Sequence, residues 1–293
     1  MNERLQRILA NPTLHRNALT DEERRPGAIN WHGSADSPRS SQALCISAFG
    51  VLRDTVPRDK VLDRLVATTL PAYRAGGRAP RWRIFLEYEE PRLLNEFGAQ
   101  AQPTSVDALL VSSKAVVAIE AKFISDASAG FGKCSAFTKG RCAGFYGPGS
   151  YGSSQAWCQL EAWHGDRSPR TYWALGREYF RPDVFRMQQQ GESCPLRSTN
   201  YQLMRNYLFA AARSRAEGIP THGVITIAPT ATSQRLRDQV AAFESQVLLP
   251  SCAGSIRHTT YEEYARHLRG SGDGSCAELA DFLEARIHTV IGQ

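Results

Sequence analysis

Two short apolar segments joined by a polar turn constrain this chain more than any other feature. Residues 104–111 and 115–123 are rich in β-branched and small apolar side chains, and a Ser-Ser-Lys sequence separates them. Segments of this kind on either side of a short turn are typical of an antiparallel β-hairpin. Residues 116–119 are all apolar, so both faces of the second strand are expected to be buried. The alternative is an ordinary surface hairpin whose ends carry solvated charges.

The register of this hairpin decides whether its acidic residues meet. A two-residue loop would place Asp107 directly opposite Glu120, whereas a three-residue loop would place Asp107 opposite Ile119. Glu120 and Lys122 share one face of their strand because side chains alternate along it. Facing carboxylates on an apolar hairpin repel each other and lose hydration unless a cation lies between them. The two-residue loop therefore predicts a divalent metal ion at Asp107 and Glu120.

The arrangement Asp107-x12-Glu120-x-Lys122 resembles the catalytic core of the PD-(D/E)xK nuclease superfamily, which has the restriction-endonuclease-like fold. Val106 stands where the superfamily's name has proline. The resemblance implies that Asp107 and Glu120 hold Mg²⁺, or Mn²⁺ in its place, with the backbone carbonyl of Ala121 as a further ligand. It also implies that Lys122 orients or activates the water that attacks the phosphodiester.

Two further segments resemble a subgroup of bacterial restriction endonucleases within this superfamily. They are residues 40–50, with the sequence Ser-Ser-Gln-Ala-Leu-Cys-Ile-Ser-Ala-Phe-Gly, and residues 201–210. The resemblance implies that both segments line the active-site cleft and that Gln42 and Gln202 are among the catalytic residues. Arg205 lies about one turn from Gln202 on the same side of a predicted helix, and we expect it to bind DNA. The alternative for this pair is a solvated helix face.

Other polar residues carry weaker signals. Glu90 and Glu96 precede the hairpin and are candidates for a further acidic ligand, although a surface acidic run explains either residue equally well. His32, His164 and His222 have no spacing with Ser or Cys that is typical of a hydrolase triad. We therefore expect these histidines to be structural.

The elements predicted around the hairpin follow the order of the superfamily's core. Without residues 124–198, the order is helix, strand, strand, strand, helix, strand, which is the αβββαβ topology. The expected fold is α/β: a restriction-endonuclease-like core with a mixed sheet flanked by helices, an insertion rich in Cys and aromatic residues, and C-terminal helices. Residues 1–40 are expected to form an N-terminal arm that contains a short helix, and residues 41–293 the nuclease domain with its insertion at 124–198.

Periodicity and capping signals set the expected boundaries of these elements. The last two helices are predicted to begin with capping boxes, Thr260 with Glu263 and Ser275 with Glu278. Strands outside the hairpin are predicted at 82–88 and 223–229. Helices are predicted at 40–52, 58–69, 155–163, 182–190, 201–213, 232–248, 260–269 and 275–291.

The insertion raises two separate expectations. It holds the cysteines Cys134, Cys142, Cys158 and Cys194, but their spacing matches no zinc finger, so buried free thiols are favoured over structural zinc. Its arginines recur every three to seven residues from Arg167 onward. Such a series suits phosphate, and we predict that Arg170 and Arg177 bind DNA along one wall of a groove.

Composition sets the limits on function. The formal charge of +6 comes mainly from arginine, which favours a polyanionic partner such as DNA. The N-terminus lacks the apolar core of a signal peptide, and no stretch is apolar enough to span a membrane, so a cytoplasmic protein is expected. The resemblance implies a Mg²⁺-dependent DNA endonuclease of bacterial restriction or defence, with a homodimer left open. The alternatives are an inactive nucleic-acid-binding protein of the same fold and a repair or recombination nuclease.

Overall fold

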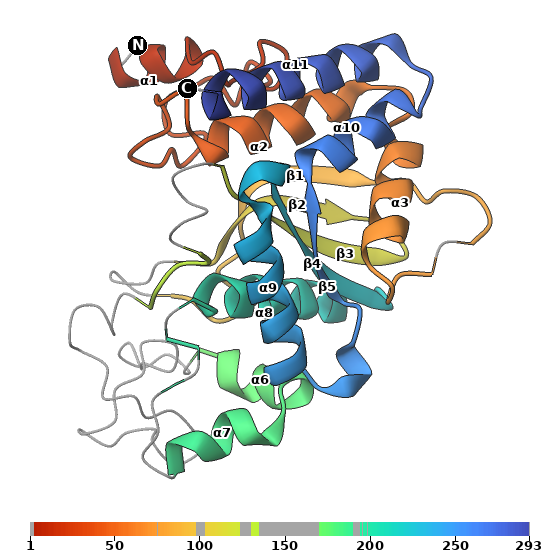
Figure 1. Ribbon diagram of the computed structural model, residues 1–293. Coiled ribbons are helices and arrows are strands. Elements are labelled where there is room, and N and C mark those ends of the chain that lie inside the picture. Colours follow the sequence, from red (N-terminus) through yellow and green to blue (C-terminus); the bar gives the residue numbers. More distant parts are fainter. Residues whose placement is uncertain are drawn as a thin grey trace.

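A five-stranded mixed sheet forms the centre of the computed structural model (Figure 1). The structure describes residues 3–74, 76–97, 103–123, 130–134, 170–189, 194, 196–197 and 199–292. The sheet order is β1-β2-β3-β4-β5. The first three strands form an antiparallel meander, and β4 and β5 continue it in parallel. The strands span β1 Arg83–Glu89, β2 Ser105–Val111, β3 Ala115–Ala121, β4 Thr221–Ala228 and β5 Ile256–Thr260.

The hairpin of β2 and β3 has the register that brings its acidic residues together. The Ser112 N–H donates to the Ala115 carbonyl at 2.9 Å, which closes a two-residue loop. Ala108 pairs with Ile119, so the next pair along the ladder is Asp107 with Glu120. Every residue of β3 is buried, as expected of a central strand. The predicted register is therefore confirmed, and the surface-hairpin interpretation is wrong.

Helices cover both faces of this sheet (Figure 1). One face buries Leu110, Val117 and Ile119 under four helices, and the opposite face buries Leu109, Val116 and Ala118 under helices from the insertion and the second half of the chain. The first group comprises α2 Ser41–Gly50, α3 Arg58–Thr69, α10 Tyr261–Arg269 and α11 Gly274–Ile291. The second comprises α6 Tyr172–Tyr179, α7 Pro182–Gln189, α8 Tyr201–Glu217 and α9 Ser233–Gln246. The predicted α/β fold with a mixed sheet between helices is confirmed.

Two local features differ from the expectations. β5 was not predicted, because it is a five-residue strand at the edge of the sheet in which four consecutive polar residues follow Ile256. The capping box expected at Ser275 is wrong, since Asp273 caps α11 by accepting the Cys276 N–H. The other capping box, Thr260 with Glu263, is confirmed. Short polar caps one or two residues apart compete, and the sequence pattern alone does not rank them.

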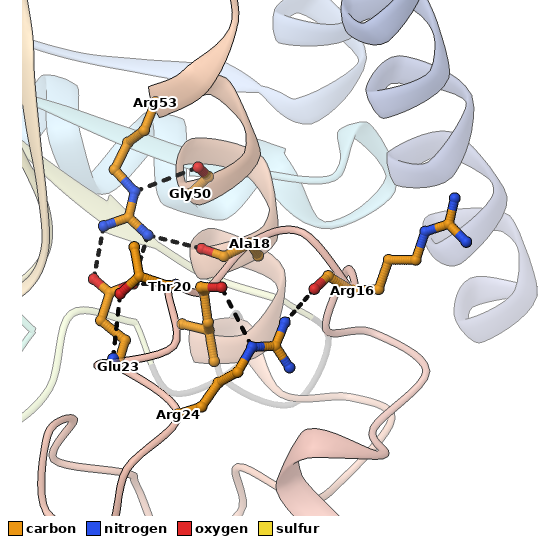
Figure 2. A network of polar contacts seen from close by, with 8 residues as sticks. Arg16, Ala18, Thr20, Glu23, Arg24, Gly50 and Arg53 are labelled. Atoms are coloured by element: carbon orange, nitrogen blue, oxygen red, sulfur yellow. Dashed lines mark hydrogen bonds and ion pairs between the residues drawn. The ribbon is translucent and has the colours of Figure 1, made fainter.

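The N-terminal arm lies against α2. It begins with the helix α1, Glu3–Leu9, and buries Leu14, Ala18 and Ile29 against the α2 side chains Ala43 and Ile46. Figure 2 shows one anchor of the arm: the Arg53 guanidinium, just beyond α2, binds both carboxylate oxygens of Glu23 at 2.6 Å and the Ala18 carbonyl at 2.9 Å. The arm is thus attached to α2, the first helix of the αβββαβ core.

Several expectations fall on parts of the chain that the structure does not describe. The helix predicted at 155–163 lies outside the described residues, as do Cys142, Cys158 and His164. Cys134 and Cys194 are described, and both are buried. Among the helices that can be described, none is long and apolar enough to cross a membrane.

Candidate active site

A row of polar residues crosses the whole sheet near the carboxyl end of β3. Glu120 pairs with Thr226 of β4, and Thr226 pairs with His258 of β5, whose Nδ1 is 2.8 Å from the Thr226 hydroxyl. On the other side, the pairs flanking Glu87 in β1 place it opposite Asp107. The three acidic members, Glu87, Asp107 and Glu120, are called the carboxylate row below.

Helix α8 and the end of β3 hold the Glu120 carboxylate between a cation and an amide. Its Oε1 lies 2.7 Å from the Lys122 Nζ, and its Oε2 accepts from the Asn206 Nδ2 at 2.5 Å. The Lys122 Nζ also donates to the Gln202 Oε1 at 3.0 Å. Gln202 and Asn206 are four residues apart, so α8 presents both toward the same strand end. The predicted triplet of Glu120, Lys122 and Gln202 therefore meets in space.

Asp107 is held by the backbone of the strand that carries Glu120. Its Oδ2 accepts the Ala121 N–H at 2.7 Å. This bond crosses from β2 to β3 at the point where the hairpin ladder ends, and it fixes one carboxylate oxygen beside the residue whose carbonyl was expected to bind metal. Asp107 and Ala121 thus lie in direct contact, as the hairpin register requires.

The segment that follows β3 packs against Lys122 and Gln202. The Phe131 carbonyl accepts the Gln202 N–H at 2.9 Å, and the Phe131 ring centroid lies 6.0 Å from the Lys122 Nζ. Gly132 has a φ of +69°, and a Cβ there would come within 3.0 Å of the Gln202 Oε1. A glycine is therefore required where the chain passes the amide that orients the lysine.

Glu87 is the member of the row that the sequence did not indicate as a site residue. Its side chain is only 3% exposed, its φ is 47°, and its Oε1 has no hydrogen-bond partner within the described residues. Burial, followed by the negative charge of Asp107, raises the pKa of Glu87 well above its usual range, although a hydrogen bond with Gln42 acts in the opposite direction. The strained backbone and the unpaired buried oxygen both mark a site rather than a scaffold position.

The charges of this region suit a divalent cation. Three carboxylates and one lysine leave an excess of two negative charges if all are ionised, and oxygen donors are the ligands that Mg²⁺ and Mn²⁺ prefer. Within the described ranges, no three His, Cys, Asp or Glu side chains already form a ready-made metal centre. Asp107 accepts the Ala121 N–H, and Glu120 accepts from the Asn206 amide. The buried Glu87 Oε1 is the atom that most plainly lacks a positive partner.

Comparison with known proteins places the chain in a family. The family model described as Restriction Endonuclease associating with ARP matches residues 3–286. The chain belongs to this REase-ARP family. No curated protein and no solved structure matches the chain. Membership in REase-ARP agrees with the αβββαβ core and supports a restriction-endonuclease-like nuclease role.

Gln42, one candidate for a fourth polar group at the active site, lies at the edge of the carboxylate row. It is buried on α2 and lies close enough to Glu87 to lower the pKa of that carboxyl. Its amide also contacts the backbone of the arm at Asn30 and His32. Gln42 therefore lies next to the row on its Glu87 side.

Arg205 and Glu96 form a separate buried cluster instead of joining the carboxylate row. The Arg205 Nη2 lies 3.1 Å from the Glu96 Oε1, and its Nε contacts the Thr104 hydroxyl at 3.1 Å and the Tyr172 hydroxyl at 3.2 Å. These four residues are called the Arg205 cluster below. The guanidinium faces into the protein, so its geometry does not favour the expected DNA contact. Glu96 is likewise not a member of the row, and Glu90 lies beyond the end of β1.

The two arginines expected in the groove wall differ in exposure. Arg170 is 6% exposed, which leaves little of it for a phosphate. Arg177 is exposed on α6, and its guanidinium lies 4.8 Å above the Phe185 ring. Of these two, only Arg177 can meet DNA without a change in the structure.

Proposed function

We propose that this REase-ARP protein is a Mg²⁺-dependent DNA endonuclease that hydrolyses phosphodiester bonds in bacterial restriction or defence. One observation carries the proposal: two acidic residues stand opposite each other at the end of the hairpin ladder, and the lysine two residues on from the second of them is held against it by an amide from α8. The alternative of an inactive DNA-binding protein gives no reason to bring three carboxylates together in one row.

The carboxylates of Asp107, Glu120 and Glu87 and the carbonyl of Ala121 would hold the ion. A bound divalent cation supplies Lewis-acid polarisation of the phosphate and an activated water. Asp107 presents a carboxylate already oriented by the Ala121 N–H, so little side-chain entropy is lost when a ligand binds there. Glu120 is similarly fixed by the Asn206 amide.

Lys122 is the residue that would meet the scissile phosphate. Its ammonium is held by the Glu120 carboxylate and the Gln202 carbonyl oxygen, which together fix a flexible side chain at one place. In this place the ammonium can donate to a phosphate oxygen or to the attacking water. Gln202 acts through Lys122 and is a positioning residue in this scheme.

DNA is the substrate that the chemistry and the charge favour. A restriction-endonuclease family acts on phosphodiesters, and the formal charge of +6 lowers the cost of approaching a polyanion. Arg177 is the exposed arginine that we assign to the DNA surface. A homodimer would place two such sites on the two strands of a duplex.

The test is cleavage of supercoiled and linear DNA with Mg²⁺, Mn²⁺ or EDTA. We expect nicked or linear products with either metal and none with EDTA. Glu89→Gln is the matched control for the row, because Glu89 lies on the same strand as Glu87 and outside the row. Wild-type protein that binds DNA but cleaves no substrate with any divalent ion would favour the inactive binding protein.

A further inference from the structure

Gln42 uses its whole amide to join the N-terminal arm to the carboxylate row. Its Oε1 accepts the His32 N–H at 2.9 Å, and its Nε2 donates to the Asn30 carbonyl at 3.0 Å. Gln42 also lies close enough to Glu87 to lower the pKa of that carboxyl. A buried amide with both of its polar atoms bonded to one arm segment is suited to hold that segment in one geometry beside the row.

The arm also reaches Glu87 directly through His32. The His32 Nε2 lies 4.0 Å from the Glu87 Oε2, and about half of the His32 side chain is exposed. The other carboxylate oxygen, Oε1, is the buried atom without a hydrogen-bond partner among the described residues. Arm contacts thus gather around one oxygen of Glu87 and leave the other for a ligand.

The position of this segment is fixed by anchors on both sides of it. Before it, Arg53 binds Glu23 and the Ala18 carbonyl (Figure 2). After it, the buried Asn11 Nδ2 donates to the Ala35 and Ser37 carbonyls, each at 2.8 Å. These anchors therefore fix the position of His32 next to Glu87.

We propose that the arm segment 30–32, clamped by Gln42, is a positioning element of the active site that holds Glu87 ready for a divalent cation. Its residues act through Glu87 and do not themselves ligate the ion. Binding of a divalent cation and docking of the arm are then coupled, and each strengthens the other. This inference rests on the proposed function, since it requires that the carboxylate row takes a cation.

The experiment measures Mn²⁺ binding by calorimetry in the full chain, without DNA. We expect Gln42→Leu to weaken Mn²⁺ about tenfold, within the range found when groups behind metal ligands are removed, and Glu87→Gln, which removes a ligand charge, to weaken it more. His32→Ala, an exposed change that leaves the fold intact, should weaken it several-fold. Arg7→Ala is the matched control, because Arg7 pairs with Asp36 at the arm surface and should keep wild-type affinity.

Hydrogen exchange at the His32 amide supplies a second readout, because that N–H is bonded to Gln42. Mn²⁺ should slow exchange of residues 29–34 in wild-type protein and in Arg7→Ala, but not in Glu87→Gln. Wild-type Mn²⁺ affinity in both Gln42→Leu and His32→Ala would overturn the inference while leaving the nuclease proposal standing. A wild-type protein that binds no Mn²⁺ would instead remove the proposed function, and this inference with it.

Discussion

Two buried polar clusters meet helix α8 within one turn of each other, and they are built in opposite ways. The Arg205 cluster contains one acid and one base, and Glu96 accepts bonds from the Thr104 N–H, the Tyr172 hydroxyl and Arg205. The carboxylate row contains three acids beside one lysine, and one of its buried oxygens has no partner among the described residues. The first cluster is balanced in charge, and the second is not.

This difference separates a scaffold from a site. A balanced, fully bonded cluster ties elements together, because removing either charge leaves the other buried without a partner. An unbalanced cluster lowers stability by itself, so a fold keeps it where a ligand supplies the missing charge. The Arg205 cluster therefore has a structural role, and the carboxylate row is the part of the molecule suited to bind a ligand.

The largest expected effect is on cleavage by the row. Glu120→Gln and Asp107→Asn keep the acceptors for Asn206 and for the Ala121 N–H but remove a charge that holds the cation. We expect DNA cleavage in Mg²⁺ to fall at least about a thousandfold, which corresponds to about 4 kcal/mol. The thermal unfolding midpoint in EDTA should stay the same or rise. A Glu120→Gln protein that cleaves DNA at the wild-type rate would assign the row to structure.

The opposite outcome is expected for the balanced cluster. Arg205→Met leaves Glu96 buried without its cation and should lower the free energy of unfolding by about 3–5 kcal/mol. Urea denaturation measures this loss, and Arg177→Met at an exposed position is the matched control with a change of about 0.5 kcal/mol or less. Stability unchanged in Arg205→Met would remove the distinction between the two clusters.

The sequence was enough to predict those contacts in the site that depend on spacing within one hairpin or one helix. The loop length of the hairpin is enough to place Asp107 opposite Glu120, and strand alternation places Lys122 beside Glu120. Helical spacing likewise indicates that Gln202 and Asn206 share a side of α8. These are relations within one hairpin or one helix, where periodicity is a direct physical constraint.

The remaining parts depend on contacts between distant segments. Glu87 joins the row because β1 pairs with β2 in one particular register and because the Glu87 backbone has a positive φ. The acidic residues in this part of the sequence predict neither feature. Arg205 and Gln202 look equivalent on the helix, but Tyr172 and Glu96, far away in sequence, bind the arginine. Tertiary packing decides both the pairing of β1 with β2 and the buried partners of Arg205.

A smaller effect concerns the stability cost of the row. The pKa of Glu87 is raised in the folded protein, chiefly by burial. The stability gained from its protonated form is therefore complete below the unfolded value near 4.5 and is lost as the pH rises through the folded-state pKa. Glu87→Gln does not ionise and should unfold at a higher temperature than wild type in EDTA, by a margin that grows from pH 4.5 to pH 8.

Thermal unfolding at several pH values measures this margin. Glu89→Gln, on the same strand but outside the row, should show no such growth. Saturating Mn²⁺ should reduce the advantage of Glu87→Gln at pH 8, since the cation stabilises only the protein that retains the carboxylate. An unfolding temperature for Glu87→Gln that tracks wild type at every pH would mean that the row carries no excess charge.

The smallest expected effect lies at the surface, where charges are screened and single contacts are weak. Arg177 stacks on Phe185 at 4.8 Å on α6, which covers the α8 face of the sheet, whereas Arg286 stacks on Phe282 at 5.6 Å on α11, on the opposite face. Arg177→Glu should weaken DNA binding in Ca²⁺ several-fold and reduce the slope of log affinity against log salt by roughly one. Arg286→Glu makes the same chemical change at the same kind of stacked site and should leave both quantities unchanged. Equal losses in the two variants would mean that the DNA responds to net charge alone, and unchanged binding in Arg177→Glu would move the DNA surface away from α6.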